Sequence, residues 1–229
     1  MGYDAKAKKW IVAIDGPSGV GKSTVAKLLA KRLGYVVLDT GAMYRAVAFR
    51  AKQTGLCLED EESLSRLASS LRVTFLTRNE ELRVLCDGED ITEAIRSPDM
   101  SSLASDISKR EGVRSALVRM QREMGRAGGV ILEGRDIGTV VFPDADVKFY
   151  LDADAEERAR RRTEELIGKG VKVTFRETLE DVIRRDRSDM TRAISPLRKA
   201  KDAVVIDSTH LSAEEVVEKM IHLIHQKEN

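Results

Sequence analysis

The sequence predicts an α/β fold with a parallel sheet, and three observations carry this prediction. Short apolar runs recur along the chain, and five of them have the length and composition of buried parallel strands. Helical patterns separate these runs, which is the alternation that builds units of strand, helix and parallel strand. The first run also leads through a glycine-rich turn directly into a helical pattern, as happens at one edge of such a sheet.

The composition fits one folded domain of ordinary size. The chain has 229 residues, of which 42% are hydrophobic and 34% are charged, and this balance excludes disorder. The formal net charge is +1, so we expect no nucleic acid polymer as a partner. No run approaches the ~20 apolar residues that a membrane span requires, and the N-terminus lacks the apolar region of a signal peptide. We therefore expect a soluble, cytoplasmic protein that does not bind membranes.

Two cysteines are too few to suggest a disulfide framework or a metal site. Cys57 and Cys86 fit a reducing compartment, where we expect both as small buried hydrophobic residues.

Acidic residues follow the expected strands, which lie over Ile11–Asp15, Tyr35–Leu38, Val130–Leu132, Val147–Leu151 and Ala203–Ile206. The acidic residues at or just past their ends are Asp15, Asp39, Glu133, Asp152 and Asp207. In open parallel sheets the ligand binds beyond the carboxyl ends of the strands. Polar residues just after each strand are therefore the first candidates for function.

The first strand is followed by Gly16-Pro17-Ser18-Gly19-Val20-Gly21-Lys22-Ser23, which fits the pattern G-x-x-x-x-G-K-[ST] at every fixed position. In this phosphate-binding loop (P-loop), backbone N–H groups face phosphate oxygens, the lysine reaches the β- and γ-phosphates, and the serine hydroxyl ligates Mg²⁺. A helix expected over Thr24–Leu33 places its N-terminus against the phosphate. The alternative is an ordinary glycine turn between a strand and a helix.

Residues from about 70 to 110 depart from the alternation of strand and helix. Leu71–Leu76 and Leu82–Cys86 alternate in polarity, with Thr77-Arg78-Asn79-Glu80 between them, which predicts an antiparallel hairpin. A small antiparallel unit inserted into a parallel fold is expected to cover a substrate. The alternative is a surface insertion without a function.

The C-terminal segment predicts an amphipathic helix that begins at a capping box. Ser212 and Glu215 have the spacing at which each side chain caps the other's backbone N–H. His222 and His225 follow on this helix, and we expect them to be solvated rather than to hold a metal, because no carboxylate partner accompanies them.

Basic residues gather after the fourth expected strand. Residues 154–201 carry 14 Lys and Arg against 10 Asp and Glu, although the whole chain has a net charge of only +1. Arg158, Arg161 and Arg162 share one helical face by their spacing. Like charges so close repel each other unless an anion or neighbouring glutamates offset them. The segment thus predicts either a phosphate-binding face or a salt-bridged helix surface.

A second basic face is expected further along the chain. Arg185, Asp189 and Arg192 fall at i, i+4 and i+7, so one helical face could hold a phosphate and a ribose hydroxyl together. The alternative is a simple ion pair between Arg185 and Asp189. Gly168-Lys169-Gly170 lies between the two basic segments and gives the flexible link that a closing lid needs.

The remaining sequence separates the classes of protein that use a P-loop. Guanine-specific switches read their base with an N-K-x-D segment, which this chain lacks. A motor usually needs a larger sheet or an oligomerisation region. Phosphoryl transfer depends on positioning and on neutralised charge, which clustered arginines supply. The sequence therefore favours a small-molecule kinase.

Four segments form a further pattern: the P-loop with Asp15, Leu38-Asp39-Thr40-Gly41-Ala42-Met43-Tyr44-Arg45, Gly134-Arg135-Asp136-Ile137-Gly138-Thr139-Val140-Val141-Phe142-Pro143, and Asp189-Met190-Thr191-Arg192-Ala193. Together they resemble the bacterial cytidylate kinase family, over nearly the whole chain. The resemblance implies a P-loop kinase fold with a five-stranded parallel sheet, and it implies transfer of the ATP γ-phosphoryl group to CMP or dCMP with Mg²⁺. It also implies a small antiparallel CMP-binding insertion and a helical lid.

The resemblance assigns residues to each substrate. The implied ATP-binding residues are Gly16, Pro17, Ser18, Gly19, Val20, Gly21, Lys22, Ser23, Thr24, Arg158 and Arg161. The implied CMP-binding residues are Thr40, Arg45, Ser105, Arg114, Arg135, Asp136, Arg185, Asp189 and Arg192. The implied catalytic residues are Lys22, Arg135, Arg161, Arg162 and Arg192, and Ser23 is the implied metal ligand.

These assignments fit the chemistry of the side chains. Guanidinium groups bind phosphate through paired hydrogen bonds, and a carboxylate at Asp136 can accept from the 4-amino group of cytosine, which uracil lacks. Two positions depart from the family pattern, since Thr40 stands where many relatives have serine and Glu133 where an aspartate is common.

We expect one kinase unit over residues 1–229, and we expect a monomer. Its core covers about 8–69, 111–153 and 202–229, its CMP-binding insertion about 70–110, and its lid about 154–190. Two alternatives remain at this point: a kinase for a different small acceptor, and a regulator that binds ATP without turnover.

Overall fold

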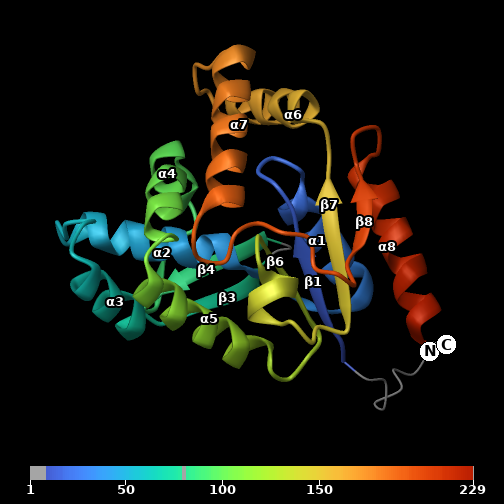
Figure 1. Ribbon diagram of the computed structural model, residues 1–229, viewed down its shortest axis with the longest axis horizontal. Helices are drawn as coiled ribbons and strands as arrows, with labels where there is room; N and C mark the ends of the chain where they lie inside the picture. The colour runs from blue at the N-terminus through green and yellow to red at the C-terminus, as the bar shows by residue number, and fades with distance from the viewer. Residues whose placement is uncertain (1–8, 79–80, 229) are drawn as a thin grey trace. The chain divides into compact units, whose positions relative to one another are not determined.

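The computed structural model describes residues 9–78 and 81–228 and confirms the α/β fold (Figure 1). Five strands form one parallel sheet in the order β2-β6-β1-β7-β8. They are β1 (Ile11–Asp15), β2 (Val36–Asp39), β6 (Val130–Gly134), β7 (Val147–Asp152) and β8 (Val204–Asp207). These are the five expected strands, with small shifts at their ends.

The chain divides into two compact units. The first unit comprises Met1–Val36, Gly125–Thr191 and Ser195–Asn229, as far as these are described. The second unit comprises Val37–Met124 and Arg192–Ile194. The helices of the first unit are α1 (Lys22–Leu33), α6 (Ala155–Gly168), α7 (Phe175–Thr191) and α8 (Ala213–Glu228), with a π-helical turn η2 (Ile137–Val141).

In the first unit, the sheet is built around β1. Val12, Ala13 and Ile14 are fully buried, which explains why this strand is apolar on both faces. β1 pairs in parallel with β6 on one side and with β7 on the other, and α1 packs against both β1 and β6. α8 packs along α1, as the red and blue helices in Figure 1 show.

Helix ends in the first unit follow local sequence signals. α1 begins at Lys22 rather than at the expected Thr24, because Gly21 adopts a left-handed conformation (φ 94°) and serves as the N-cap. The capping box of α8 is confirmed: the Ser212 Oγ accepts from the Glu215 N–H at 3.2 Å, and the Glu215 carboxylate accepts from the Ser212 N–H at 2.8 Å.

The second unit combines helices with a three-stranded antiparallel sheet in the order β3-β4-β5. Its strands are β3 (Val73–Arg78), β4 (Glu81–Cys86) and β5 (Glu89–Asp90). Its helices are α2 (Thr40–Gln53), α3 (Glu61–Ser70), a 3-10 turn η1 (Ala94–Arg96), α4 (Pro98–Ile107) and α5 (Glu111–Gly125), the last of which ends at the boundary of the unit.

The expected hairpin is confirmed as β3 and β4. Thr77 and Arg78, which were expected in its turn, belong to β3, because their register continues to the pair of Arg78 with Glu81. The expected turn residues Asn79 and Glu80 lie outside the described residues. Helix α4 was not predicted, because residues from about 70 to 110 were interpreted as one antiparallel unit.

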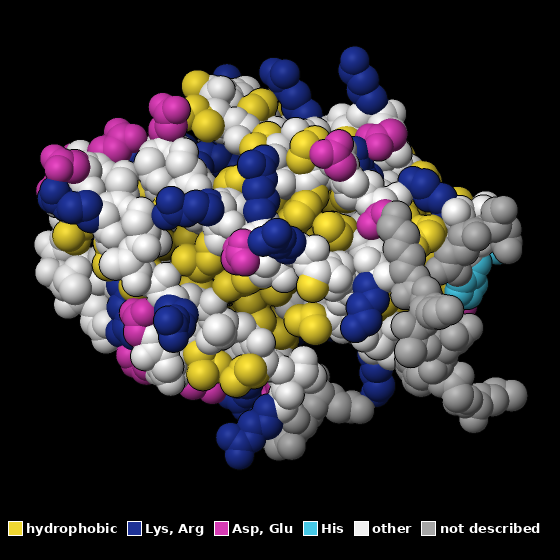
Figure 2. Space-filling view, turned by 90° about the horizontal axis from the view of Figure 1, so that it is seen from below, with side chains coloured by type: hydrophobic (Ala, Val, Ile, Leu, Met, Phe, Trp, Pro, Cys, Tyr) yellow, Lys and Arg dark blue, Asp and Glu magenta, His cyan; other side chains and the backbone are white. Residues whose placement is uncertain are grey.

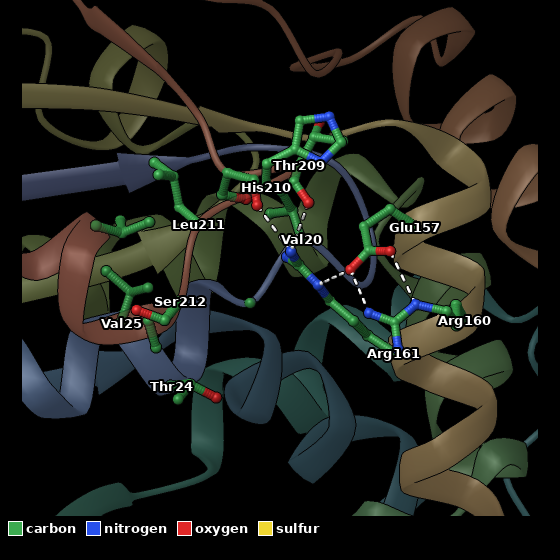
Figure 3. Close-up of a pocket in the computed structure, with 14 residues that line it drawn as sticks. Val20, Thr24, Val25, Glu157, Arg160, Arg161, Thr209, His210, Leu211 and Ser212 are labelled. Carbon is green, nitrogen blue, oxygen red and sulfur yellow. Dashed lines mark hydrogen bonds and ion pairs between the residues drawn. The ribbon is translucent and has the colours of Figure 1, made fainter.

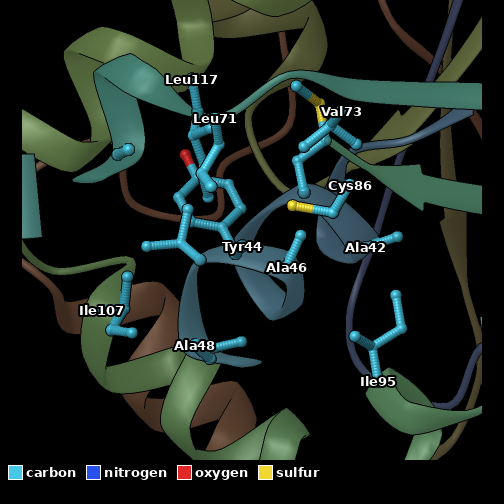
Figure 4. Packing of buried hydrophobic residues seen from close by; sticks show 14 of the residues in the cluster. Ala42, Tyr44, Ala46, Ala48, Leu71, Val73, Cys86, Ile95, Ile107 and Leu117 are labelled. Atoms are coloured by element: carbon cyan, nitrogen blue, oxygen red, sulfur yellow. The ribbon is translucent and has the colours of Figure 1, made fainter. Parts of the chain in front are cut away.

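The core of the second unit forms around the small side chains of α2 (Figure 4). Ala42, Ala46 and Ala48 are fully buried, so the sheet and neighbouring helices can approach the backbone of α2 closely. Cys86 is buried in this cluster, as expected, whereas Cys57 is exposed and the expectation that both cysteines are buried was wrong. Cys57 lies in the short connection after α2, where its Sγ donates to a carboxylate oxygen of Glu59 at 2.8 Å.

The expected helical face of Arg185, Asp189 and Arg192 is only partly formed. α7 ends at Thr191, so Arg192 is not a helical residue. The helix ends there because the chain turns back: the Asp189 carbonyl accepts from the Leu197 N–H at 2.8 Å, and Ser195 has a positive φ of 48°.

The surface carries mixed charge. On the face shown in Figure 2, Lys and Arg side chains stand among acidic and apolar ones rather than in one continuous basic patch. Within the part of the chain that the structure describes, no helix is long and apolar enough to cross a membrane.

The close approach of the P-loop to β7 generates a stability prediction. A Cβ on Gly16 would lie 2.1 Å from the Leu151 carbonyl oxygen, so the Gly16→Ala variant must displace backbone. We expect a loss of about 1–3 kcal/mol in the free energy of unfolding, measured by urea denaturation. The control is Gly168→Ala, where a Cβ meets nothing within 4 Å and the change should stay within about 0.5 kcal/mol. Equal stabilities of the two variants would contradict the close contact.

Candidate active site

The P-loop connects the end of β1 to the start of α1. Gly19 and Gly21 both have left-handed φ angles, 75° and 94°, which let the loop turn tightly into the helix. Gly21 has no side chain to cap α1, so backbone N–H groups at the helix N-terminus are available to an anion, which the helix dipole also favours. The loop therefore has the geometry of a phosphate site.

Lys22 is the buried cation of this loop. Its Nζ donates to the Gly16 carbonyl at 2.8 Å and to the Pro17 carbonyl at 2.6 Å. The pKa of Lys22 is lowered to about 7, mainly by burial and then by the positive charge of Arg135, although nearby carboxylates oppose the shift. Neutral carbonyls compensate the ammonium poorly, so a phosphate oxygen would stabilise its charged form much better.

Asp15, at the end of β1, is a buried carboxylate with only 4% of its surface exposed. Its two oxygens each accept a backbone N–H at 2.8 Å, one from Ile137 and one from Gly138. Burial nevertheless raises the pKa of Asp15 to about 6. The carboxylate thus ties the end of the central strand to η2, directly after Asp136.

Arg135 and Asp189 form an ion pair beside this strand end. Arg135 follows β6 directly, and its Nε lies 2.7 Å from an oxygen of Asp189 on α7. Asp136, the next residue, is buried. The structure thus brings together three of the residues that the resemblance assigns to CMP, and all of them belong to the first unit.

All three arginines of the expected basic face of α6 have protein partners. Arg161 pairs with Glu157 at 2.7 Å and Arg162 pairs with Glu165 at 2.6 Å, which matches the salt-bridged alternative. Arg158 is buried and contacts the P-loop. On α7, Arg185 pairs with Asp181 at 2.9 Å.

A pocket of about 620 Å³ lies beside the P-loop (Figure 3). Its walls come from the start of α1, from α6 and from the loop between β8 and α8. Arg161 crosses the pocket and its Nη2 donates to the carbonyls of Ser208 at 2.7 Å and Thr209 at 3.1 Å. Val20, Val25 and Leu211 supply apolar surface. A pocket that offers both polar groups and apolar side chains, next to a phosphate site, suits a nucleoside base.

Sequence reasoning missed the wall formed by Ser208, Thr209, His210 and Leu211. The signal was available, because these residues directly follow the carboxyl end of β8, where ligands of parallel sheets bind.

The second unit holds the other residues assigned to CMP. Arg45 pairs with Asp39 at 2.9 Å, and Asp39 also caps α2 by accepting from the Ala42 N–H at 2.8 Å. The Nε of Arg45 is buried and has no hydrogen-bond partner within the described residues. Thr40 is buried at the start of α2.

Ser108 joins two arginines of the second unit. Its carbonyl accepts from Arg114 at 3.2 Å, and its hydroxyl lies 3.3 Å from an Nη of Arg192. The same hydroxyl donates to the Ser105 carbonyl at 2.7 Å. Arg114 also stacks over the ring of Tyr44, 5.5 Å from its centre. Three of the residues assigned to CMP, Ser105, Arg114 and Arg192, thus contact a serine that the sequence did not single out.

The residues assigned to CMP are therefore divided between the units. The first unit holds Arg135, Asp136, Arg185 and Asp189, and the second unit holds Thr40, Arg45, Ser105, Arg114 and Arg192.

The fold and the P-loop define a class of protein. A phosphate loop at the end of the central parallel strand, with a buried lysine and an adjoining base-sized pocket, is the site of a P-loop kinase. A family model described as cytidylate kinase matches residues 12–226. The chain belongs to the cytidylate kinase family.

Individual relatives agree with this family. A cytidylate kinase of Geobacter sulfurreducens is 56% identical over 218 residues, which cover 95% of this chain and 94% of that protein. A cytidylate kinase of Bacillus subtilis is 46% identical over 220 residues, covering 96% of this chain and 98% of that protein. A solved structure of an uncharacterized protein from Eubacterium ventriosum superposes with a TM-score of 0.54 at 12% identity. That structure covers 95% of this chain and 99% of its own, and it supports the fold alone.

The raised pKa of Asp15 generates a pH prediction. Because the folded-state pKa is about 6 and the ordinary value is 3.8, the folded protein binds the proton more tightly than the unfolded chain does. The cost of the buried charge is therefore present above pH 6 and is relieved as the pH falls toward 4. Relative to Asp15→Asn, the wild-type protein should gain about 1 kcal/mol in the free energy of unfolding between pH 7 and pH 5. Parallel pH profiles of the two proteins in urea denaturation would contradict this burial cost.

Proposed function

We propose that this chain transfers the γ-phosphoryl group of ATP to CMP and dCMP, giving CDP and dCDP. The observation that carries the proposal is a pair of neighbouring cations, the buried Lys22 and the partly buried Arg135, whose charge adds to the effect of burial in lowering the pKa of Lys22. One belongs to the phosphate loop and the other follows β6, so they can neutralise a transferring group between a donor and an acceptor phosphate.

ATP is the proposed donor. Residues Gly16–Thr24 hold its phosphates through backbone N–H groups and Lys22. The pocket beside Arg161 holds its base, with Val20 and Leu211 against the ring faces.

The donor set at the start of α1 fits Mg²⁺ better than a transition metal. Ser23 is exposed beside Lys22 and offers a hydroxyl oxygen, and the described residues contain no cluster of three or more His, Cys, Asp or Glu side chains. Mg²⁺ prefers oxygen ligands and keeps several waters, so one hydroxyl and the ATP phosphates suffice. Ser23 would hold the ion, which would supply positive charge that neutralises the phosphates.

CMP is the proposed acceptor. Arg45, Arg135 and Arg192 bind its phosphate through paired hydrogen bonds. The Arg45 guanidinium retains a buried N–H without a hydrogen-bond partner within the described residues, which supports a ligand contact there.

The other polar residues bind the base and the sugar of CMP. Asp136 accepts from the cytosine 4-amino group, and Ser105 and Arg114 contact the same base. Thr40, Arg185 and Asp189 bind the sugar side.

The reaction needs no strong general base, because the phosphate oxygen of CMP is already an anionic nucleophile. Lys22 and Arg135 orient donor and acceptor in line and neutralise the charge on the transferring oxygens. Arg161, Arg162 and Arg192 add positive charge. Exclusion of water by the substrates prevents hydrolysis of ATP.

We expect the acceptor preference to follow Asp136. In a coupled ADP-release assay, wild-type protein should turn over CMP and dCMP much faster than UMP or AMP. Asp136→Ala should reduce the CMP/UMP ratio of kcat/KM about 10- to 100-fold, because one base-reading carboxylate is worth about 1–3 kcal/mol. Equal turnover of CMP and UMP by the wild-type protein would favour a kinase for another acceptor. An unchanged ratio in Asp136→Ala would remove this residue from base recognition.

Lys22 provides the test of the donor site. Lys22→Ala should lower kcat at least about 10²-fold, because it removes a preorganised cation from the transferring group. The fold should be retained, because the variant also removes a poorly compensated buried charge. The matched control is Lys27→Ala, an exposed position on the same helix. Near-normal turnover in Lys22→Ala would defeat the phosphate-loop function, and ATP binding without turnover of any monophosphate by the wild-type protein would favour a regulator.

A further inference from the structure

A buried ion pair between α6 and α7 contacts the backbone of the P-loop. Arg158 Nη2 lies 2.7 Å from Asp186 Oδ2, and only 6% and 12% of the two side chains are exposed. α6 and α7 pack against each other along the same region (Figure 1). Among the described ion pairs of these two helices, this one has both side chains most deeply buried.

Both backbone polar groups of Ser18 are occupied by this pair. The Ser18 N–H donates to Asp186 Oδ1 at 3.2 Å, and the Ser18 carbonyl accepts from Arg158 Nη1 at 2.8 Å. Arg158 Nε donates to the Ala153 carbonyl at 2.9 Å. Each of the three guanidinium nitrogens therefore has a protein partner, and the two peptide groups that flank Ser18 are each held by one hydrogen bond.

The loop needs such support because of its own composition. Ser18 lies between Gly16 and Gly19, and glycines restrict the backbone least of all residues. Gly19 also runs against α6, where a Cβ would lie 3.4 Å from the Arg158 carbonyl oxygen. The conformation of the loop is therefore set by contacts with α6 and α7 as well as by its own sequence.

We propose that Arg158 and Asp186 are positioning residues that clamp the P-loop in its ATP-binding conformation and anchor the adjoining ends of α6 and α7 to the donor site. This inference rests on the proposed function, and it gives Arg158 a role through Ser18 rather than a direct contact with ATP. Asp186 had no role in the sequence analysis. Asp189, one turn further along α7, is paired with Arg135, so the same stretch of helix is anchored to the P-loop and to the end of β6.

The clamp also limits which part of the expected lid can move. Arg158 lies in the first turn of α6 and Asp186 lies near the end of α7. Both anchors are therefore remote in sequence from Gly168-Lys169-Gly170, where the two helices connect. The connecting end can move, while the anchored ends remain part of the phosphate site.

The test separates positioning of the loop from stability of the fold. A buried ion pair can often be replaced by apolar side chains without loss of stability, whereas removal of one partner leaves an uncompensated charge. The double variant Arg158→Met/Asp186→Leu should therefore unfold within a few degrees of the wild-type protein, while Asp186→Asn should unfold at a distinctly lower temperature. The matched control is Arg176→Met/Glu180→Leu, which removes an exposed ion pair from α7.

Binding of MgATP and of CMP is measured by calorimetry, well below the unfolding temperature of each variant. We expect the Kd for MgATP to rise about 10- to 100-fold in the double variant and in Asp186→Asn, because small displacements of a positioned group cost this much. The Kd for CMP should change much less, and the control should bind both as the wild-type protein does. Normal MgATP binding in the double variant, or equal weakening of MgATP and CMP in both variants, would overturn the clamp. A wild-type protein that binds no MgATP would overturn the proposed function instead.

Discussion

The site of the first unit depends on one constraint: charges buried at the end of a parallel sheet must be compensated by the protein itself. Asp15 is compensated by two backbone N–H groups, Arg158 by Asp186, and Arg135 by Asp189. Within the described part of the chain, Lys22 is compensated by two carbonyls and by more distant carboxylates, and its pKa is lowered to about 7. The arrangement leaves one cation whose best partner is a phosphate, at the point where the helix N-terminus also favours an anion.

This constraint links stability to function. Because each of these pairings joins two different elements, the charges hold together β1, β6, η2, α6 and α7 around the phosphate loop. Their net contribution to the free energy of unfolding is small, since desolvation offsets much of the attraction. Their main effect is on geometry, because hydrogen-bonded charges fix the directions of the groups that meet the substrates. In the second unit, Ser108 has a comparable position, since it contacts both Arg114 and Arg192.

Much of the fold was predictable because it follows from local patterns. The apolar run of β1, the capping box of Ser212 and Glu215, and the alternation of β3 and β4 depend on neighbouring residues, and the structure confirms all three. The errors arose where distant contacts compete with local preference. Arg192 was expected to extend the face of α7. The helix ends before it, and the chain turns back so that the Leu197 N–H donates a hydrogen bond to the Asp189 carbonyl. Helix α4 was not predicted, because residues 70–110 were interpreted from the hairpin pattern alone.

The sequence by itself determined the P-loop, its following helix, the order of the parallel strands along the chain, and the family, because these depend on motifs and on short-range periodicity. Only the tertiary structure decided which charges pair. Arg185 had Asp189 at a suitable spacing but pairs with Asp181, whereas Asp189 pairs with Arg135 from another element. Arg158 pairs with Asp186 on another helix and donates to the Ser18 carbonyl of the P-loop. Charge pairing depends on distances between elements and on burial, and neither is encoded in the spacing of residues along one helix.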